Sequence, residues 1–384
     1  PIAEVLEELV RRLPVAPGRF QVSQRAPYTL TSVSSGVTTQ AQWSAALAEL
    51  ESLRAQEAPG AQYYGMVRPI SGAGITGIGY VNALASAAPS LSALGVDASH
   101  ANWRRTMIHE FGHNYSRRHA PCGNPDNPDP DYPYPGGVLG PTPLFDSLAN
   151  RVMSSFGHTD VMGYCNGSWF SDYNLREMQR FLEARARSST ATPGASSADL
   201  LVVSGIINGT GAQLVPVRAA RGRAHGPQGG PHLLRVKTRD GAIIEKFFTT
   251  VDVDHAGSDG HFQVNLADPG EIASIEVLRD GRPLPVSGIS ARPRLPTRFA
   301  IGVTMEGPWA TAALRGDQLD VTWNVTATPH ATLTLVEAGH RQILALNASG
   351  GKFSLPLAAS HSGRLLEVSL SDGLNARLVT IPLP

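Results

Sequence analysis

The chain has 384 residues, 42% of them hydrophobic, and its 32 basic and 32 acidic residues give a formal net charge of zero. This length exceeds what one hydrophobic core normally serves, so we expect two or three domains. The balanced charge argues against nucleic acid as a partner, and no apolar run is long enough to predict a membrane span.

The first part of the chain predicts a mixed unit of helices and strands. Apolar residues recur at helical spacing between Val37 and Glu57, which predicts an amphipathic helix. Strands are expected on either side of it, at Arg19–Leu30 and Ala61–Val67, to give a βαβ opening. The glycine-rich stretch Gly72–Val81 is either an edge strand or a flexible loop.

Three histidines and one glutamate follow with the spacing of a metal site. On a helix His109 and His113 lie one turn apart on one face, so both rings can reach one metal ion. Glu110, between them, is placed to act on a metal-bound water and is the candidate general base. His119 joins them only if the chain turns sharply after about Tyr115.

The segment from His109 to His119 resembles the H-E-x-x-H-x-x-G-x-x-H signature of the metzincin zinc endopeptidases. It departs from that signature at Ser116, where those enzymes carry a glycine that ends the helix in a left-handed conformation. Either Asn114, Tyr115 or Ser116 therefore takes a strained conformation, or the helix ends differently and His119 still arrives.

A second resemblance lies in the segment from Asp160 to Cys165, which is similar to the metzincin Met-turn. The resemblance implies that Met162 forms an apolar floor beneath the metal ligands. It also implies that the hydroxyl of Tyr164 binds the oxyanion of the tetrahedral intermediate. Residues 60–187 carry the likeness, which is closest to bacterial secreted metzincins, including the mucin-degrading kind.

The chain has two cysteines, Cys122 and Cys165, each a few residues beyond an element of the expected zinc site. A disulfide between them would tie the two loops together and stabilise the fold by roughly 4 kcal/mol. It would also imply an oxidising compartment. Two reduced thiols, or two further metal ligands, are the alternative.

The loop between the third histidine and the Met-turn gathers Asp126, Asp129 and Asp131. These carboxylates make calcium possible. The prolines in the loop favour a solvated or helix-capping role instead. His158 can line a specificity pocket or lie at the surface.

Two further helices are expected around this site. Asp97 or Ser99 can cap the helix that carries His109 and His113. A closing helix is predicted at Ser171–Arg187, where arginines near its end complement the helix dipole. The Ser/Thr/Ala/Pro/Gly stretch Ser188–Ser197 then predicts a linker.

Beyond residue 198 short apolar runs alternate with Gly, Asp, Asn and Pro turns, which is typical of antiparallel sandwiches. Arg292–Pro296 predicts a second boundary, and Trp323 a buried core tryptophan. We therefore expect an α+β chain: a metzincin-like domain at 1–188, a β-sandwich at 198–291 and an immunoglobulin-like β-sandwich at 296–384.

The function expected from these features is that of a secreted zinc endopeptidase with one catalytic ion, acting on extracellular proteins or glycoproteins. The sandwiches are expected to bind glycans or surfaces. Two alternatives stay open: a non-catalytic glycan-binding adhesin on the same scaffold, and a zinc hydrolase of a non-peptide amide.

Overall fold

The structure, a computed structural model, describes residues 2–33, 36–68, 74–84, 86, 89–188, 198–222, 229–289, 309–357 and 363–383. The N-terminal part has the elements α1 (Ile2–Arg12), η1 (Pro17–Arg19), α2 (Gln40–Glu57), β1 (Tyr63–Val67), β2 (Gly77–Val81), β3 (Ser92–Val96), α3 (Trp103–Asn114), η2 (Pro135–Gly137), β4 (Leu144–Asp146), β5 (Arg151–Met153) and α4 (Asp172–Ser188).

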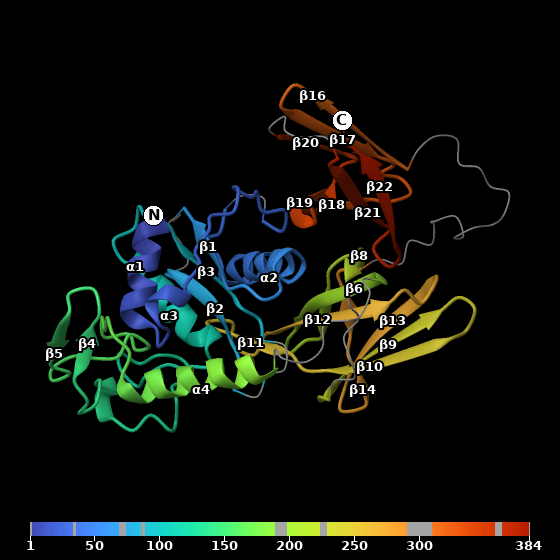
Figure 1. Ribbon diagram of the computed structural model, residues 1–384. Helices are drawn as coiled ribbons and strands as arrows, with labels where there is room; N and C mark the ends of the chain where they lie inside the picture. Colours follow the sequence, from blue (N-terminus) through green and yellow to red (C-terminus); the bar gives the residue numbers. More distant parts are fainter. Residues whose placement is uncertain are drawn as a thin grey trace.

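A short sheet supports helix α3, which carries the first two histidines. β1 pairs parallel with β3, and β2 pairs antiparallel with β3 on its other side. Strand β3 is buried throughout, and α3 lies against both β2 and β3. Met107, Ile108 and Phe111 of α3 enter a core shared with α1 and α4. The sheet and these helices form the frame on which the histidine segment is held (Figure 1).

Helix α2 confirms the helix predicted between residues 37 and 57, although it is buried on more than one side, against β3 and against β19. It begins with a capping box, in which Thr39 accepts from the backbone N–H of Gln42 and the Gln42 side chain accepts from the backbone N–H of Thr39. Its residues Trp43 and Leu47 are buried in a cluster with strand β2. The same cluster contains residues that come from the second half of the chain.

The second part consists of strands that enclose their own apolar core. They are β6 (Ala198–Ile207), β7 (Ala212–Leu214), β8 (Arg218–Gly222), β9 (His232–Thr238), β10 (Ile243–Phe248), β11 (Val251–Val253), β12 (Gly260–Ala267), β13 (Ile272–Arg279), β14 (Arg282–Pro283) and β15 (Val286–Ser287). β10, β9, β13 and β14 form one sheet, and the remaining strands belong to another.

That second sheet does not stop within its own part of the chain. Strand β11 pairs with β12 on one side and with β2 on the other, both antiparallel. A nine-stranded sheet therefore runs from β1 through β3, β2, β11, β12, β6 and β7 to β15, with β8 attached to β6. Figure 1 shows β11 reaching from the yellow strands towards β2. This connection places residues near 254 beside the histidine segment.

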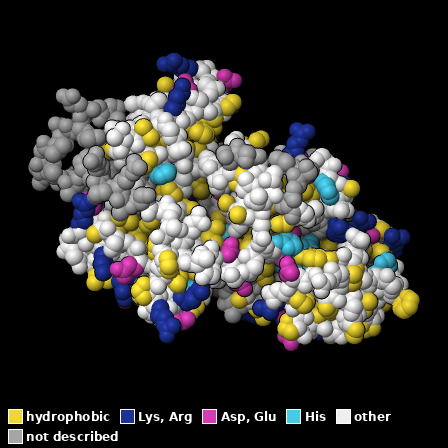
Figure 2. Space-filling model, turned by 180° about the vertical axis from the view of Figure 1, so that it is seen from behind, with side chains coloured by type: hydrophobic (Ala, Val, Ile, Leu, Met, Phe, Trp, Pro, Cys, Tyr) yellow, Lys and Arg dark blue, Asp and Glu magenta, His cyan; other side chains and the backbone are white. Residues whose placement is uncertain are grey.

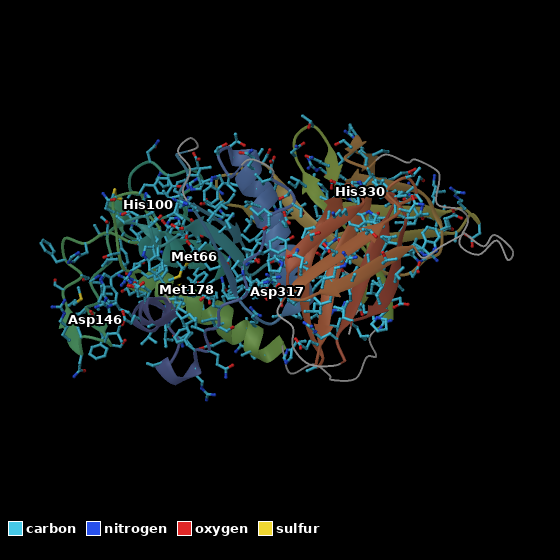
Figure 3. All side chains as sticks on the ribbon, turned by 90° about the horizontal axis from the view of Figure 1, so that it is seen from above. Met66, His100, Asp146, Met178, Asp317 and His330 are labelled. Carbon is cyan, nitrogen blue, oxygen red and sulfur yellow. A yellow bond between two sulfur atoms is a disulfide. The ribbon has the colours of Figure 1, made fainter. Side chains whose placement is uncertain are left out.

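The third part also consists of two sheets around a separate core. Its strands are β16 (Ala310–Arg315), β17 (Gln318–Trp323), β18 (His330–Glu337), β19 (His340–Ser349), β20 (Lys352–Pro356), β21 (Leu365–Ser371) and β22 (Ala376–Pro382). Trp323 is buried in this core, as expected. Viewed from above, Asp317 and His330 lie on this part and Met66 and Met178 lie in the N-terminal part (Figure 3).

The expected α+β class, with a metzincin-like helix-and-sheet domain leading two sandwiches, is wrong. The chain is mostly β, with 39% of residues in strands and 19% in helices. The excess of strand has two causes: the second and third parts consist of strands, and one of those strands extends the N-terminal sheet. No helix in the described ranges is long and apolar enough to cross a membrane.

Two local predictions are also wrong. The strand expected at Arg19–Leu30 is absent: Arg19 ends η1, and residues 20–30 form no strand. This segment instead lies against α2 through side chains, where Arg25 donates to Glu57 and the Tyr28 hydroxyl to Glu49. The helix that carries the histidines begins at Trp103, with Asn102 at its N-cap, so neither Asp97 nor Ser99 caps it. Asp97 instead accepts hydrogen bonds from Ser99.

Other expected elements lie where they were predicted. The closing helix is α4 and the strand at Ala61–Val67 is β1. The glycine-rich stretch ends in strand β2, which is not the expected edge strand because it pairs with both β3 and β11. Helix α1 was not predicted; it buries Leu9 against the core beneath α3. Ser188, the first residue of the predicted linker Ser188–Ser197, ends α4. The rest of that linker and the predicted boundary at 292–296 lie outside the described residues.

Candidate metal centre

Helix α3 presents His109 and His113 on one face, because residues four apart in a helix lie one turn above each other. Their Nε2 atoms are 3.1 Å apart. One ligand atom from each of His109, His113, His119 and Asp254 lies within 4.8 Å of the others, so this group could hold a metal ion. Figure 2 shows one side of the molecule, on which histidine side chains gather beside acidic side chains.

His119 reaches the group because α3 ends in a left-handed turn at Ser116. Ser116 has a φ of 70°, so the serine itself takes the conformation for which glycine is favoured. The N–H of Ser116 donates to the carbonyl of His113, and the N–H of Arg117 to that of Gly112. These two bonds are the Schellman motif, which reverses the chain at a helix end. The first alternative for Ser116 is confirmed.

The second nitrogen of each histidine is held by a backbone carbonyl. The Nδ1 atoms of His109, His113 and His119 lie 2.8, 2.8 and 2.6 Å from the carbonyl oxygens of Val161, Arg117 and Asp126. A carbonyl only accepts, so each Nδ1 must donate, and each Nε2 keeps a free lone pair. Zinc is commonly bound by three imidazole nitrogens, each from a ring whose other nitrogen donates to a carbonyl or carboxylate. The three histidines have this arrangement, with Nε2 facing the site and Nδ1 bonded to a carbonyl.

Burial lowers the pKa of two of these imidazoles. Burial first, then His113 and His119, hold the pKa of His109 well below its usual range. Burial, followed by the neighbouring His113, lowers the pKa of His119 to about 4. Neutral imidazole is the form that ligates a metal. His109 and His119 can therefore bind a cation at neutral pH without first losing a proton.

Asp254 is the fourth member of the group, and we did not predict it from the sequence. It follows strand β11, and its Oδ1 lies 3.3 Å from the Nε2 of His119, while its Oδ2 lies 3.5 Å from that of His113. Only 5% of Asp254 is exposed. Burial would raise the pKa of Asp254, but His113, His119 and His255 together hold it below its usual value. No spacing relates residue 254 to the histidines, so only long-range strand pairing reveals it.

Glu110 lies beside the four-residue group, outside it. Its carboxylate faces β2, where Cβ atoms added to Gly77 or Gly79 would come within 2.4 and 3.1 Å of its oxygens. The Oε2 atom is buried and has no hydrogen-bond partner in the described part of the chain. Burial, followed by the charge of Asp254, raises the pKa of Glu110 well above its usual value. A cation in the site would oppose both effects and favour the carboxylate.

Met162, which the resemblance places beneath the metal ligands, packs against helix α3. It is fully buried, and its sulfur would meet a Cβ at Gly112 of α3 within 2.3 Å. The turn around it is fixed by Asp160, whose Oδ1 accepts from the backbone N–H of Met162. A glycine at position 112 is thus needed for close packing between helix and turn.

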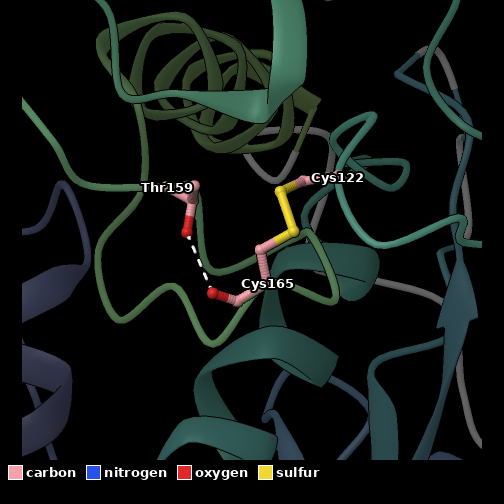
Figure 4. Close-up of a disulfide and its surroundings, with 3 residues drawn as sticks. All are labelled: Cys122, Thr159 and Cys165. Atoms are coloured by element: carbon pink, nitrogen blue, oxygen red, sulfur yellow. Dashed lines mark hydrogen bonds between the residues drawn. A yellow bond between two sulfur atoms is a disulfide. The ribbon is translucent and has the colours of Figure 1, made fainter.

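Cys122 and Cys165 form the expected disulfide, and it joins the loop after His119 to the loop after Met162. The two Cα atoms are 5.6 Å apart. The Thr159 hydroxyl donates to the carbonyl of Cys165 at the base of the same loop (Figure 4). The two loops that flank the site are therefore covalently linked.

Tyr164 lies at the mouth of the group. Its hydroxyl is 3.2 Å from the Nε2 of His119 and 3.4 Å from the ring nitrogens of His255, with 39% of the residue exposed. Its ring stacks on that of His255. Burial, followed by Asp254 and Glu110, raises its pKa above the usual value. Tyr164 is thus protonated and can donate a hydrogen bond into the site.

The aspartates of the preceding loop serve other roles in the structure. Asp126 offers its backbone carbonyl to His119, and Asp129 accepts from Arg117 and Tyr173. The backbone N–H of Asp131 donates to Asp129. His158 is exposed. Within the described ranges, the only group with metal-ligand geometry is the one around the three histidines.

Comparisons with known proteins supply no family. No protein-family model matches the sequence, and no curated protein does. A solved pullulanase from Anoxybacillus sp. LM18-11 with maltotriose is similar over 48% of this chain and 25% of its own, at 10% identity and a TM-score of 0.16. The BSP domain of a biofilm-associated protein is similar over 49% and 29%, at 12% identity and a TM-score of 0.15.

The chain spans about a quarter of the length of the pullulanases it matches, including pullulanase type I from Bacillus subtilis str. 168. At such TM-scores the likenesses carry no argument about function.

Proposed function

We propose that the chain is a zinc-dependent endopeptidase, secreted into an oxidising environment, that cleaves extracellular proteins or glycoproteins. The observation that carries the proposal is the convergence of three Nε2 lone pairs, from His109, His113 and His119, beside the buried carboxylate of Glu110. The Oε2 atom of that carboxylate has no hydrogen-bond partner among the described residues. The Cys122–Cys165 disulfide supports the compartment.

The residues have distinct roles in this proposal. The three histidines would hold the ion, which would supply a Lewis acid that polarises a carbonyl and acidifies a water. Glu110 would take the proton of the attacking water and pass it to the leaving amine. The Tyr164 hydroxyl, 3.2 Å from His119, would donate to the oxyanion as it develops.

A peptide substrate is favoured over a non-peptide amide by the edge of β2. This strand accepts an antiparallel neighbour, since β11 pairs with it next to the metal group. Main-chain pairing along a sheet edge is a general way to hold an extended polypeptide. Glycan or surface binding by the strand-rich second and third parts stays a prediction.

The test is Glu110→Gln, compared with Glu183→Gln on the exposed face of α4 as the matched control. We expect Glu110→Gln to keep its zinc and to lose at least ~100-fold in turnover, because a general base contributes on that scale. Turnover should be measured on unfolded protein, glycoprotein and peptide substrates, with and without chelator. The variants should be made both in the wild-type chain and with Asp254→Ala, which removes the fourth member of the group.

Two results would contradict the proposal. One is full turnover by a zinc-loaded Glu110→Gln variant. The other is hydrolysis by the wild-type chain that survives complete removal of metal.

A further inference from the structure

The segment from Val251 to His261, which we call the docking hairpin, comprises β11, the following turn and the start of β12. It fills the edge of β2: Asp252 pairs with Val81 and Val253 with Tyr80. The N–H of Asp254 then donates to the carbonyl of Gly79 at 2.9 Å. The main-chain positions that an extended substrate would need are therefore taken by the chain itself.

The same hairpin fills the metal site. The carboxylate of Asp254 lies among the imidazoles, with its Oδ1 3.3 Å from His119 and its Oδ2 3.5 Å from His113. Oδ2 is buried and also lies 3.1 Å from the Nε2 of His255, but it makes no hydrogen bond in the described part of the chain. A zinc ion with four protein ligands has the closed coordination of a structural site, whereas a catalytic zinc keeps one position for water or substrate.

The hairpin is held in place by apolar and polar contacts with the N-terminal part. Val253 and Ala256 are buried in the cluster that contains Trp43 and Leu47 of α2. His261, buried at 4% exposure, bonds to the Ser44 and Tyr80 hydroxyls, each at 2.8 Å. These contacts lie on both sides of Asp254, so its position is set by a docked structural element rather than by a free loop.

We propose that the chain folds in a self-inhibited form, in which the docking hairpin closes the metal site with Asp254 and blocks the substrate edge with β11. This inference rests on the proposed endopeptidase function. One element obstructs both requirements of catalysis, so a single event, withdrawal of the hairpin, opens both. Substrate then takes the place of β11 and runs antiparallel to β2, in the same chain direction as residues 251–254.

A structural metal that joins the two parts of the chain is the competing account. Both accounts use the same four residues, but they differ in what Asp254 does. If it inhibits, its removal opens the site and raises activity. If Asp254 is a ligand of a structural metal, its removal weakens metal binding and does not raise activity.

The experiment uses the full chain loaded with Co²⁺, whose visible spectrum reports coordination, and acetohydroxamate as a probe for an open position. The variants are Asp254→Ala and the near-isosteric Asp254→Asn, which keeps the backbone bond to Gly79. Asp252→Ala is the matched control, because Asp252 is an exposed carboxylate on the same strand. Hydrolysis of an unfolded protein is measured in parallel.

We expect wild type and Asp252→Ala to show a four-ligand spectrum that the probe does not change. Both Asp254 variants should keep Co²⁺ and bind the probe, because loss of the carboxylate opens a position on the metal. They should also hydrolyse substrate about 10-fold faster or more, because the hairpin loses its contact with the metal site and leaves β2 more often, and little of the self-inhibited chain is competent. Equal probe binding and turnover in all four proteins would overturn self-inhibition, as would loss of Co²⁺ from both Asp254 variants. Probe binding gained without hydrolysis of any substrate would support the closed coordination and overturn the endopeptidase function instead.

Discussion

The two segments that meet at the metal group differ in how they reach it. His109, His113 and His119 lie within 11 consecutive residues and are positioned by one helix and one turn. Asp254 directly follows strand β11, more than a hundred residues later in the chain. It lies beside the histidines only because β11 pairs with β2. Local spacing therefore supplies the open site, and long-range pairing supplies the group that closes it.

Breaking the Cys122–Cys165 disulfide should have the largest effect on stability. The effect should be on the segment that carries the three histidines, because the bond joins the loop after His119 to the loop after Met162. The bond constrains a 43-residue separation. Replacing both cysteines with alanine should therefore lower the free energy of unfolding by about 4 kcal/mol in the chain-entropy model. Chemical denaturation of the double variant measures this, with near-ultraviolet circular dichroism to follow the N-terminal part. An unchanged midpoint would show that the two loops are held together without the bond.

Lowering the pH should instead weaken the contacts that hold the docking hairpin on the N-terminal part, and so lower the free energy of unfolding. Burial lowers the pKa of His261 to about 4, below the usual 6.5 of an unfolded histidine. The unfolded chain therefore binds more protons between these values, so the contribution of His261 is complete above pH 6.5 and is lost as the pH falls towards 4. Between pH 7 and pH 5 the loss should be on the order of 2 kcal/mol.

His261→Gln isolates this contribution, since glutamine can still hydrogen-bond to Ser44 and Tyr80 but does not titrate. The stability of the metal-free variant, measured by denaturation at both pH values, should depend less on pH than that of the wild-type chain. Equal pH dependence in the two proteins would mean that His261 titrates normally and that the hairpin is not held by a buried neutral imidazole.

The smallest effect is expected at the turn that brings His119 to the group. Ser116→Gly removes the Cβ from a left-handed residue, which relieves about 1 kcal/mol, but it adds backbone freedom to the unfolded chain. We expect a net stabilisation of roughly 0.5 kcal/mol, with metal affinity unchanged. Thermal denaturation with Ser116→Ala as the control measures it. A destabilised glycine variant would mean that the serine hydroxyl contributes a contact that outweighs the strain.

The sequence predicted what local chemistry determines. Histidines four residues apart on a helix must share a face. If His119 is to reach them, the chain must turn at Asn114, Tyr115 or Ser116, where the metzincin signature has its helix-ending glycine. Both inferences needed no knowledge of the rest of the fold, and the structure bears them out. The Cys122–Cys165 pair followed in the same way from its position around the site.

What the sequence did not predict depends on contacts between distant segments. Residues 243–253 carry one apolar run in the sequence, but they divide into β10 and β11, which belong to different sheets. Because of that division β11 pairs with β2, which places Asp254 beside the three histidines. The predicted α+β class was wrong for the same reason, because a sheet that crosses between parts of the chain leaves no periodicity in either part.

The central claim is that His109, His113 and His119 bind one zinc ion that Asp254 closes. Zinc K-edge X-ray absorption of the wild-type chain and of His119→Ala tests it most directly. The account predicts one zinc per wild-type chain, bound by three imidazoles and one carboxylate. In His119→Ala one imidazole should be lost and zinc affinity should fall at least ~100-fold, the upper end of what loss of even an outer-shell partner causes. A wild-type chain that binds no zinc, or a His119→Ala variant with an unchanged coordination shell, would contradict it.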